Sequence, residues 1–263
     1  MPTTTSDGQT LYYERQGRGR RLFFCIGSGS TVEGSELMIG AFARSFELVV
    51  WDYRGMGRST GPPDPYAMAD CARDALAVLE AVGWDSTPVL GISFGGMVAQ
   101  ELAVTAPERI ERLALLCTSP GGAGGSSYPL HELEGLSDSE RASKRRQLMD
   151  TRFDNAWLAS HPQDLALVQA LEGRTADPDP SARAGHLRQL EARRGHDVWD
   201  RLPSIDCPTF VGCGRFDGIA PPRNSAAMAS RIARSELHTY EGGHAFLAQD
   251  RRSLGEVTAF LSQ

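Results

Sequence analysis

The 263-residue sequence contains no uncharged apolar run that approaches the ~18 residues of a membrane-spanning helix. Its first residues also lack the basic start and the apolar stretch of a secretory leader. There is no excess of basic charge, since the net charge is -6 at pH 7. Nucleic-acid binding needs a basic face, which this balance does not provide. We therefore expect a cytoplasmic protein with no membrane and no nucleic-acid partner.

Cysteine is scarce and unpatterned. The five cysteines are odd in number and scattered along the chain. Three of them, Cys25, Cys117 and Cys213, lie in short apolar runs that resemble buried strands. Small buried thiols of this kind are typical of a reducing compartment, so we expect no disulfide framework.

Nucleotide and metal motifs are incomplete. The glycine-rich turn Gly27–Thr31 completes neither G-x-G-x-x-G nor a lysine-bearing P-loop, and taken alone it favours a flexible loop. The pair His131–Glu132 does not extend into the HExxH zinc motif. We therefore expect no metal and no organic cofactor.

Short apolar runs alternate with helical patterns in the first part of the chain. Strands are predicted at 11–15, 21–26, 46–51, 89–92 and 110–117, and helices at 33–44, 66–82 and 97–105. Such alternation predicts an α/β fold whose mostly parallel sheet is covered by helices on both faces.

This alternation stops at a glycine-rich stretch after Pro120. The following residues suggest several helices and no strand, and Ser137-x-x-Glu140 has the pattern of a capping box. Strands resume at 208–214 and 236–240. We therefore expect one α/β core made of residues 1–120 and 204–263, with an inserted helical cap at 121–203.

The spacing Gly91-x-Ser93-x-Gly95 is that of a nucleophile elbow, in which a strand turns sharply into a helix and exposes a serine hydroxyl. Glycine is needed beside the serine because a side chain there would collide with the neighbouring strand or helix. An apolar run precedes the motif, and a helical run from Met97 to Thr105 follows it. This context favours Ser93 as a nucleophile.

A serine nucleophile requires a base and a third group that orients the base. In an open parallel sheet, these groups lie in loops beyond the carboxyl ends of strands. Among the six histidines, only His244 lies in a glycine-flanked loop after a predicted strand. Four others are expected at the solvent-exposed surface of the cap: His131, His161, His186 and His196. His238 is expected within the final strand.

Asp217 is the only carboxylate just beyond the predicted strand at 208–214. A lone aspartate in a Gly/Pro loop more often forms a turn. However, the order Ser93, Asp217, His244 is that of the nucleophile-elbow enzymes, and each residue follows its own strand. The three residues are therefore predicted to form a catalytic triad.

These motifs resemble the α/β-hydrolase superfamily over nearly the whole chain. The matching segments are Gly91–Met97, Asp52–Ser59, Gly214–Asp217 and Gly242–His244. In detail the chain is most similar to the branch of 3-oxoadipate enol-lactonases, small esterases and cofactor-free perhydrolases. The resemblance implies a serine hydrolase that cleaves a small-molecule carboxylic ester or lactone through an acyl-enzyme.

The resemblance also implies an oxyanion hole made of the backbone amides of Gly29 and Phe94, the first assigned to within one residue. Here Gly27-Ser28 replaces the usual His-Gly of the family. Because the donor is a backbone amide, the changed side chains need not remove it.

Three alternatives stay open. Carbon-carbon bond hydrolysis and perhydrolysis use the same triad, and a non-catalytic ligand-binding protein can have the same fold. Haloalkane dehalogenases and epoxide hydrolases are disfavoured because they carry aspartate where this chain has Ser93. The predicted cap also contains a single tyrosine, Tyr128, where epoxide hydrolases use two. The sequence does not indicate an oligomeric state.

Overall fold

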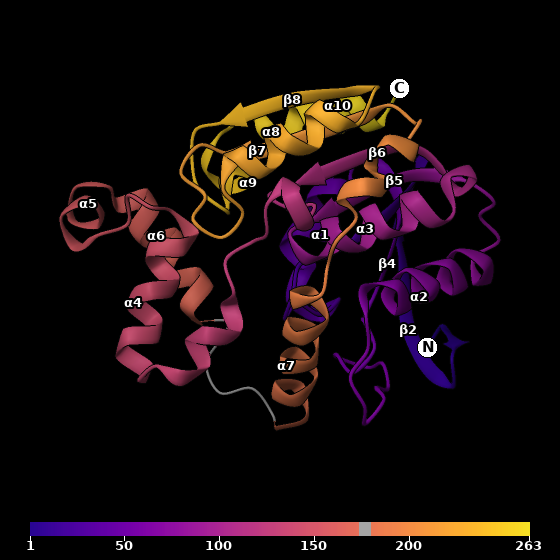
Figure 1. The fold of residues 1–263 in the computed structure, drawn as a ribbon, viewed down its shortest axis with the longest axis horizontal. Helices are drawn as coiled ribbons and strands as arrows, with labels where there is room; N and C mark the ends of the chain where they lie inside the picture. The colour runs from indigo at the N-terminus through magenta and orange to yellow at the C-terminus, as the bar shows by residue number, and fades with distance from the viewer. Residues whose placement is uncertain (174–179) are drawn as a thin grey trace.

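The computed structural model describes residues 1–173 and 180–263. Its centre is an eight-stranded sheet in the order β1-β2-β4-β3-β5-β6-β7-β8 (Figure 1). The strands are β1 (Thr3–Ser6), β2 (Gln9–Gly17), β3 (Arg20–Cys25), β4 (Phe46–Trp51), β5 (Thr87–Ile92), β6 (Ile110–Leu116), β7 (Thr209–Gly214) and β8 (Ser235–Tyr240). Pairing is parallel from β4 to β8 and antiparallel for β1 and β2. The predicted α/β fold is confirmed; β1 was missed because Thr3–Ser6 is short, polar and without apolar alternation.

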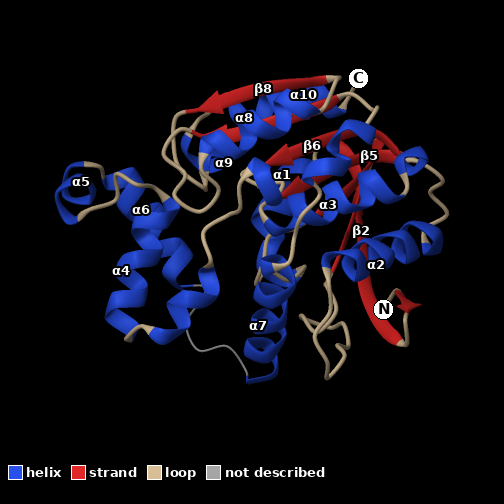
Figure 2. Cartoon of the chain, viewed as in Figure 1, coloured by secondary structure: helices blue, strands red, loops and turns tan. Residues whose placement is uncertain are grey.

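Ten α-helices accompany this sheet in the described residues (Figure 2). They are α1 (Glu36–Ala43), α2 (Met68–Ala81), α3 (Phe94–Thr105), α4 (Asp138–Met149), α5 (Asn155–Ser160), α6 (Pro162–Gly173), α7 (Pro180–Arg194), α8 (Pro222–Arg231), α9 (Phe246–Gln249) and α10 (Ser253–Leu261). Within the described ranges, none of these helices is both long and apolar enough to cross a membrane.

The strand order reverses between β3 and β5. The connection after β3 leads through α1 to β4 on one side, whereas the connection after β5 leads through α3 to β6 on the other. Right-handed crossovers then place α1 on one face of the sheet, and α2, α3 and α8 on the opposite face. The loops that follow β3 and β5 therefore flank the crevice where open α/β sheets bind ligands.

An aromatic chain joins the sheet to α3. The rings of Phe23 and Trp51 stack at 4.5 Å, and Tyr53 packs edge-on against Trp51 at 5.2 Å and Phe94 at 5.1 Å. All four side chains are fully buried. Aromatic pairs of this geometry add to the free energy of burial. The start of α3 is thus packed firmly against the strands.

The segment between β6 and β7 forms helices and no strand in its described part. Figure 1 shows α4, α5 and α6 as a group that stands apart from the sheet. The predicted capping box is present at the start of α4, where the Ser137 amide donates to Glu140 Oε2 at 3.0 Å. The limits of a separate cap, residues 121–203, remain a prediction.

Candidate active site

Ser93 lies between β5 and α3 in a strained turn. Its backbone has φ 55° and ψ -116°, a region that costs a non-glycine residue about 1–3 kcal/mol. The turn is held by a hydrogen bond from the Ser93 amide to the Leu116 carbonyl at 2.9 Å. The flanking glycines are required by space: a β-carbon on Gly95 would lie 2.0 Å from the Cys25 carbonyl oxygen, and one on Gly91 would lie 2.5 Å from the Gly95 oxygen.

Of the three residues predicted as a triad, His244 lies within hydrogen-bond distance of both Ser93 and Asp217. His244 Nε2 is 3.0 Å from Ser93 Oγ, and His244 Nδ1 is 2.8 Å from Asp217 Oδ2. The Asp217 side chain is fully buried, and its Oδ1 accepts hydrogen bonds from the Ile219 and Ala220 amides, both at 2.8 Å. This arrangement can pass a proton from the serine hydroxyl to the imidazole.

The end of α4 supports the loops that carry the acid and the histidine. The His244 amide donates to the Met149 carbonyl at 2.6 Å, and the Gly218 amide donates to the Leu148 carbonyl at 3.0 Å. The Thr151 amide donates to Phe216 in the acid loop at 2.9 Å. The residues at the end of α4 therefore hold in place the two loops that carry Asp217 and His244.

The two predicted oxyanion donors, the backbone amides of Phe94 and Gly29, differ in their hydrogen bonding. Phe94 is the first residue of α3, where an amide has no partner within the helix. By contrast, the Gly29 amide donates to Gln189 Oε1 of α7 at 2.8 Å, so this amide already has a hydrogen-bond partner. Gly29 has φ 70°, which turns the chain at this point. The Ser28 amide, one residue earlier, makes no hydrogen bond with any described residue.

Four histidines of the cap segment were predicted to be solvent-exposed, but three are half-buried and one is buried: His131, His161, His186 and His196. His196 is only 6% exposed, and burial lowers its pKa to about 4. His186 is half-buried against Gly29: a β-carbon on that glycine would lie 3.2 Å from His186 Nε2. For His186 and His196, the expectation was wrong because the charged segment that carries them packs onto the loops after β3 and β6. Burial also lowers the pKa of His186.

The buried His196 predicts an acid-sensitive fold. The unfolded chain binds a proton at His196 near pH 6.5, whereas the folded chain binds it only near pH 4. Protonation therefore favours the unfolded chain between these two pH values. The free energy of unfolding is highest above pH 6.5 and decreases as the pH falls toward 4. At pH 4.5 this loss amounts to about 2 kcal/mol of unfolding free energy. Urea unfolding at pH 7 and pH 4.5 should show a smaller difference for His196→Phe than for wild type; an equal difference would contradict the assignment.

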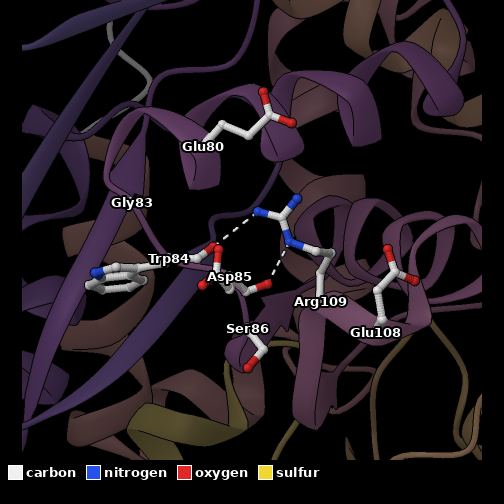
Figure 3. Close-up of a pocket in the computed structure, with 7 residues that line it drawn as sticks. All are labelled: Glu80, Gly83, Trp84, Asp85, Ser86, Glu108 and Arg109. Carbon is white, nitrogen blue, oxygen red and sulfur yellow. Dashed lines mark hydrogen bonds between the residues drawn. The ribbon is translucent and has the colours of Figure 1, made fainter.

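A cavity of about 580 Å³ lies at the opposite rim of the sheet. Its lining residues come from the end of α2 and from the segments that precede β5 and β6: Glu80, Gly83, Trp84, Asp85, Ser86, Glu108 and Arg109. Figure 3 shows Arg109 directed at the backbone oxygens of Trp84 and Asp85, to which it donates hydrogen bonds at 3.0 and 2.6 Å. This cavity is at the amino ends of the strands and has no connection with Ser93.

Sequence reasoning missed the contribution of α7. Gln189 and Arg193 are buried beside the loops of the site, and neither belongs to a motif. Gln189 accepts the hydrogen bond from the Gly29 amide. The negative charge of Asp217 raises the pKa of Arg193 and so opposes the effect of burial. Among the described residues, no group of three His, Cys, Asp or Glu side chains is arranged to hold a metal ion.

Comparisons with known proteins identify the family of the chain. Residues 23–250 match the family described as alpha/beta hydrolase fold. A RutD protein of Azorhizobium caulinodans, provisionally named a carbamate hydrolase, is 26% identical over 94% of this chain and 93% of its own. A 2-hydroxymuconate semialdehyde hydrolase of Pseudomonas is 30% identical over 87% and 81%. The solved enol-lactonase of Burkholderia xenovorans superposes over the full length of both chains with a TM-score of 0.81 at 20% identity. The chain therefore belongs to the α/β-hydrolase family.

Proposed function

We propose that the protein is a serine hydrolase that cleaves a carboxylic ester or lactone of a small molecule. The observation that carries this proposal is the continuous hydrogen-bonded path from Ser93 Oγ through His244 to Asp217, with distances of 3.0 and 2.8 Å. A hydroxyl is a weak nucleophile at neutral pH, and this path supplies the base that it needs.

In the proposed reaction, Ser93 Oγ attacks the carbonyl carbon as His244 Nε2 takes its proton. Asp217 holds the imidazole by its Nδ1–H and stabilises the imidazolium that forms. His244 then donates the proton to the leaving alcohol, which leaves Ser93 acylated. A water molecule, deprotonated by His244, attacks the acyl-enzyme and releases the acid, and the proton returns to Ser93.

The carbonyl oxygen becomes negatively charged in both steps and requires two donors. We infer that these are the amides of Phe94 and Ser28, in place of Gly29, whose amide is occupied by Gln189. The loop that carries Ser28 lies beside the nucleophile, since a β-carbon on Gly27 would be 4.0 Å from Ser93 Cβ. A preorganised donor of this kind is worth about 3 kcal/mol in the transition state.

A second candidate is hydrolysis of a carbon-carbon bond with the same triad. It is favoured by the relative named 2-hydroxymuconate semialdehyde hydrolase, which is 30% identical. Hydrolysis of an ester is favoured by the relative named poly(3-hydroxyalkanoate) depolymerase, which is 27% identical over 90% of this chain. Parallel assays with p-nitrophenyl esters, simple lactones and a 2-hydroxymuconate semialdehyde would separate the two.

Active-site labelling tests the proposal directly. A fluorophosphonate should label the wild-type protein at Ser93, because the reagent reacts with serines that are activated by a neighbouring base. The site of labelling is found by peptide mass spectrometry, and p-nitrophenyl butyrate hydrolysis should disappear in step with labelling. Binding of a small molecule without labelling or turnover would instead support a ligand-binding protein.

A further inference from the structure

Arg193 is a buried cation that has no partner in the part of the chain that the structure describes. Its side chain makes no hydrogen bond and no ion pair with any described residue, although only 8% of the residue is exposed. Its Nη2 atom is fully buried and unsatisfied. Burial lowers the pKa of Arg193 to about 10, so the guanidinium remains charged at neutral pH. Buried charges are normally paired, which makes this one an exception that requires an explanation.

The nearest negative charge cannot serve as the missing partner. Asp217 attracts Arg193 electrostatically, but no ion pair joins them. Both Asp217 oxygens are already engaged, Oδ1 with two backbone amides and Oδ2 with His244. The other titratable groups that respond to the charge of Arg193 are His186 and His196, and burial lowers the pKa of both. No carboxylate of the described chain is therefore available to Arg193.

Arg193 shares a face of α7 with residues that reach the reaction centre. His186, Gln189 and Arg193 are spaced by three and four residues, which aligns them along one side of the helix. Gln189 accepts from the Gly29 amide, and His186 lies against the same glycine. Gln189 Nε2 is a second buried donor without an acceptor. Two unsatisfied donors thus lie one turn apart on the helix face that covers the loop beside Ser93.

We propose that Arg193 and Gln189 Nε2 bind a carboxylate carried by the substrate, so that the substrate is an anionic ester or lactone. This inference rests on the proposed hydrolase function and specifies its substrate class. A carboxylate supplies the acceptors that both donors lack, and the guanidinium binds it with charge-assisted hydrogen bonds. The bound anion restores the charge balance of the buried site when the substrate enters.

The test compares esters that differ in one charge. Mono-p-nitrophenyl succinate, glutarate and adipate are each assayed against the neutral p-nitrophenyl ester of the same chain length. Wild type should prefer at least one anionic ester by about 10-fold in kcat/KM. Arg193→Met should lower kcat/KM for that ester by about 30-fold, mainly through KM, and leave the neutral ester within about 3-fold. Arg194→Met is the matched control, because Arg194 is exposed and should alter neither ester.

Each result decides between the two proposals. Hydrolysis of both esters without preference, or an equal loss of both in Arg193→Met, overturns the carboxylate site and leaves the hydrolase intact. If no ester is cleaved and fluorophosphonate does not label Ser93, the hydrolase proposal fails. The thermal shift caused by free glutarate then decides the binding site on its own. A shift in wild type that Arg193→Met lacks supports the site, and no shift in wild type overturns it.

Discussion

Ser93→Ala is expected to lower kcat for p-nitrophenyl ester hydrolysis by about 10⁴- to 10⁶-fold. The substitution removes the only oxygen that His244 Nε2 contacts in the triad, at 3.0 Å, and with it the covalent step. The β-carbon remains, so the backbone of the elbow keeps its conformation. The small residual rate reflects the oxyanion donors, which still stabilise attack by water.

A serine elsewhere provides the control for this prediction. Ser230 is exposed, and its hydroxyl donates only to the Ala227 carbonyl within α8. Ser230→Ala should therefore retain full activity. Melting temperatures and circular dichroism establish that both variants are folded. Turnover by Ser93→Ala within about 10-fold of wild type would mean that another group is the nucleophile.

The elbow was predictable because its requirements are local. The short apolar β5, the glycines at 91 and 95 and the helix after Ser93 are all consecutive, and each is needed to place a serine in a strained turn. Asp217 and His244 are distant from Ser93 in sequence. They follow β7 and β8, and the carboxyl ends of parallel strands lie at the same rim of the sheet. Topology thus converts the order of three residues into proximity.

The environment above Ser93 was not predictable, because it depends on how α7 docks. Arg193 and Arg194 are adjacent in a charged segment and are indistinguishable by sequence, yet Arg193 is buried and Arg194 is exposed. His196 and Gln189 are likewise buried by contacts with distant loops. Charged residues are usually solvated, so the composition of this segment predicts a solvated surface. The hydrogen bond from the Gly29 amide to Gln189 was not predictable for the same reason, since the two residues are 160 positions apart.

Asp217→Asn is expected to lower kcat by about 10⁴-fold while the protein stays folded. The amides of Ile219 and Ala220 both donate to Oδ1, so the oxygen of the introduced asparagine must occupy that position. Its NH₂ group then faces His244 Nδ1, 2.8 Å from the present Oδ2. That nitrogen must become an acceptor, which moves the imidazole proton to Nε2.

An imidazole protonated at Nε2 cannot accept the proton of Ser93, and a neutral amide cannot stabilise an imidazolium. The loss should therefore appear in kcat and equally in the rate of fluorophosphonate labelling, because both require deprotonation of Ser93. Asp154→Asn is the matched control: Asp154 accepts from the Trp157 amide at the start of α5, and asparagine serves as well in that position. Labelling of Asp217→Asn at the wild-type rate would show that His244 does not depend on Asp217 for its tautomer.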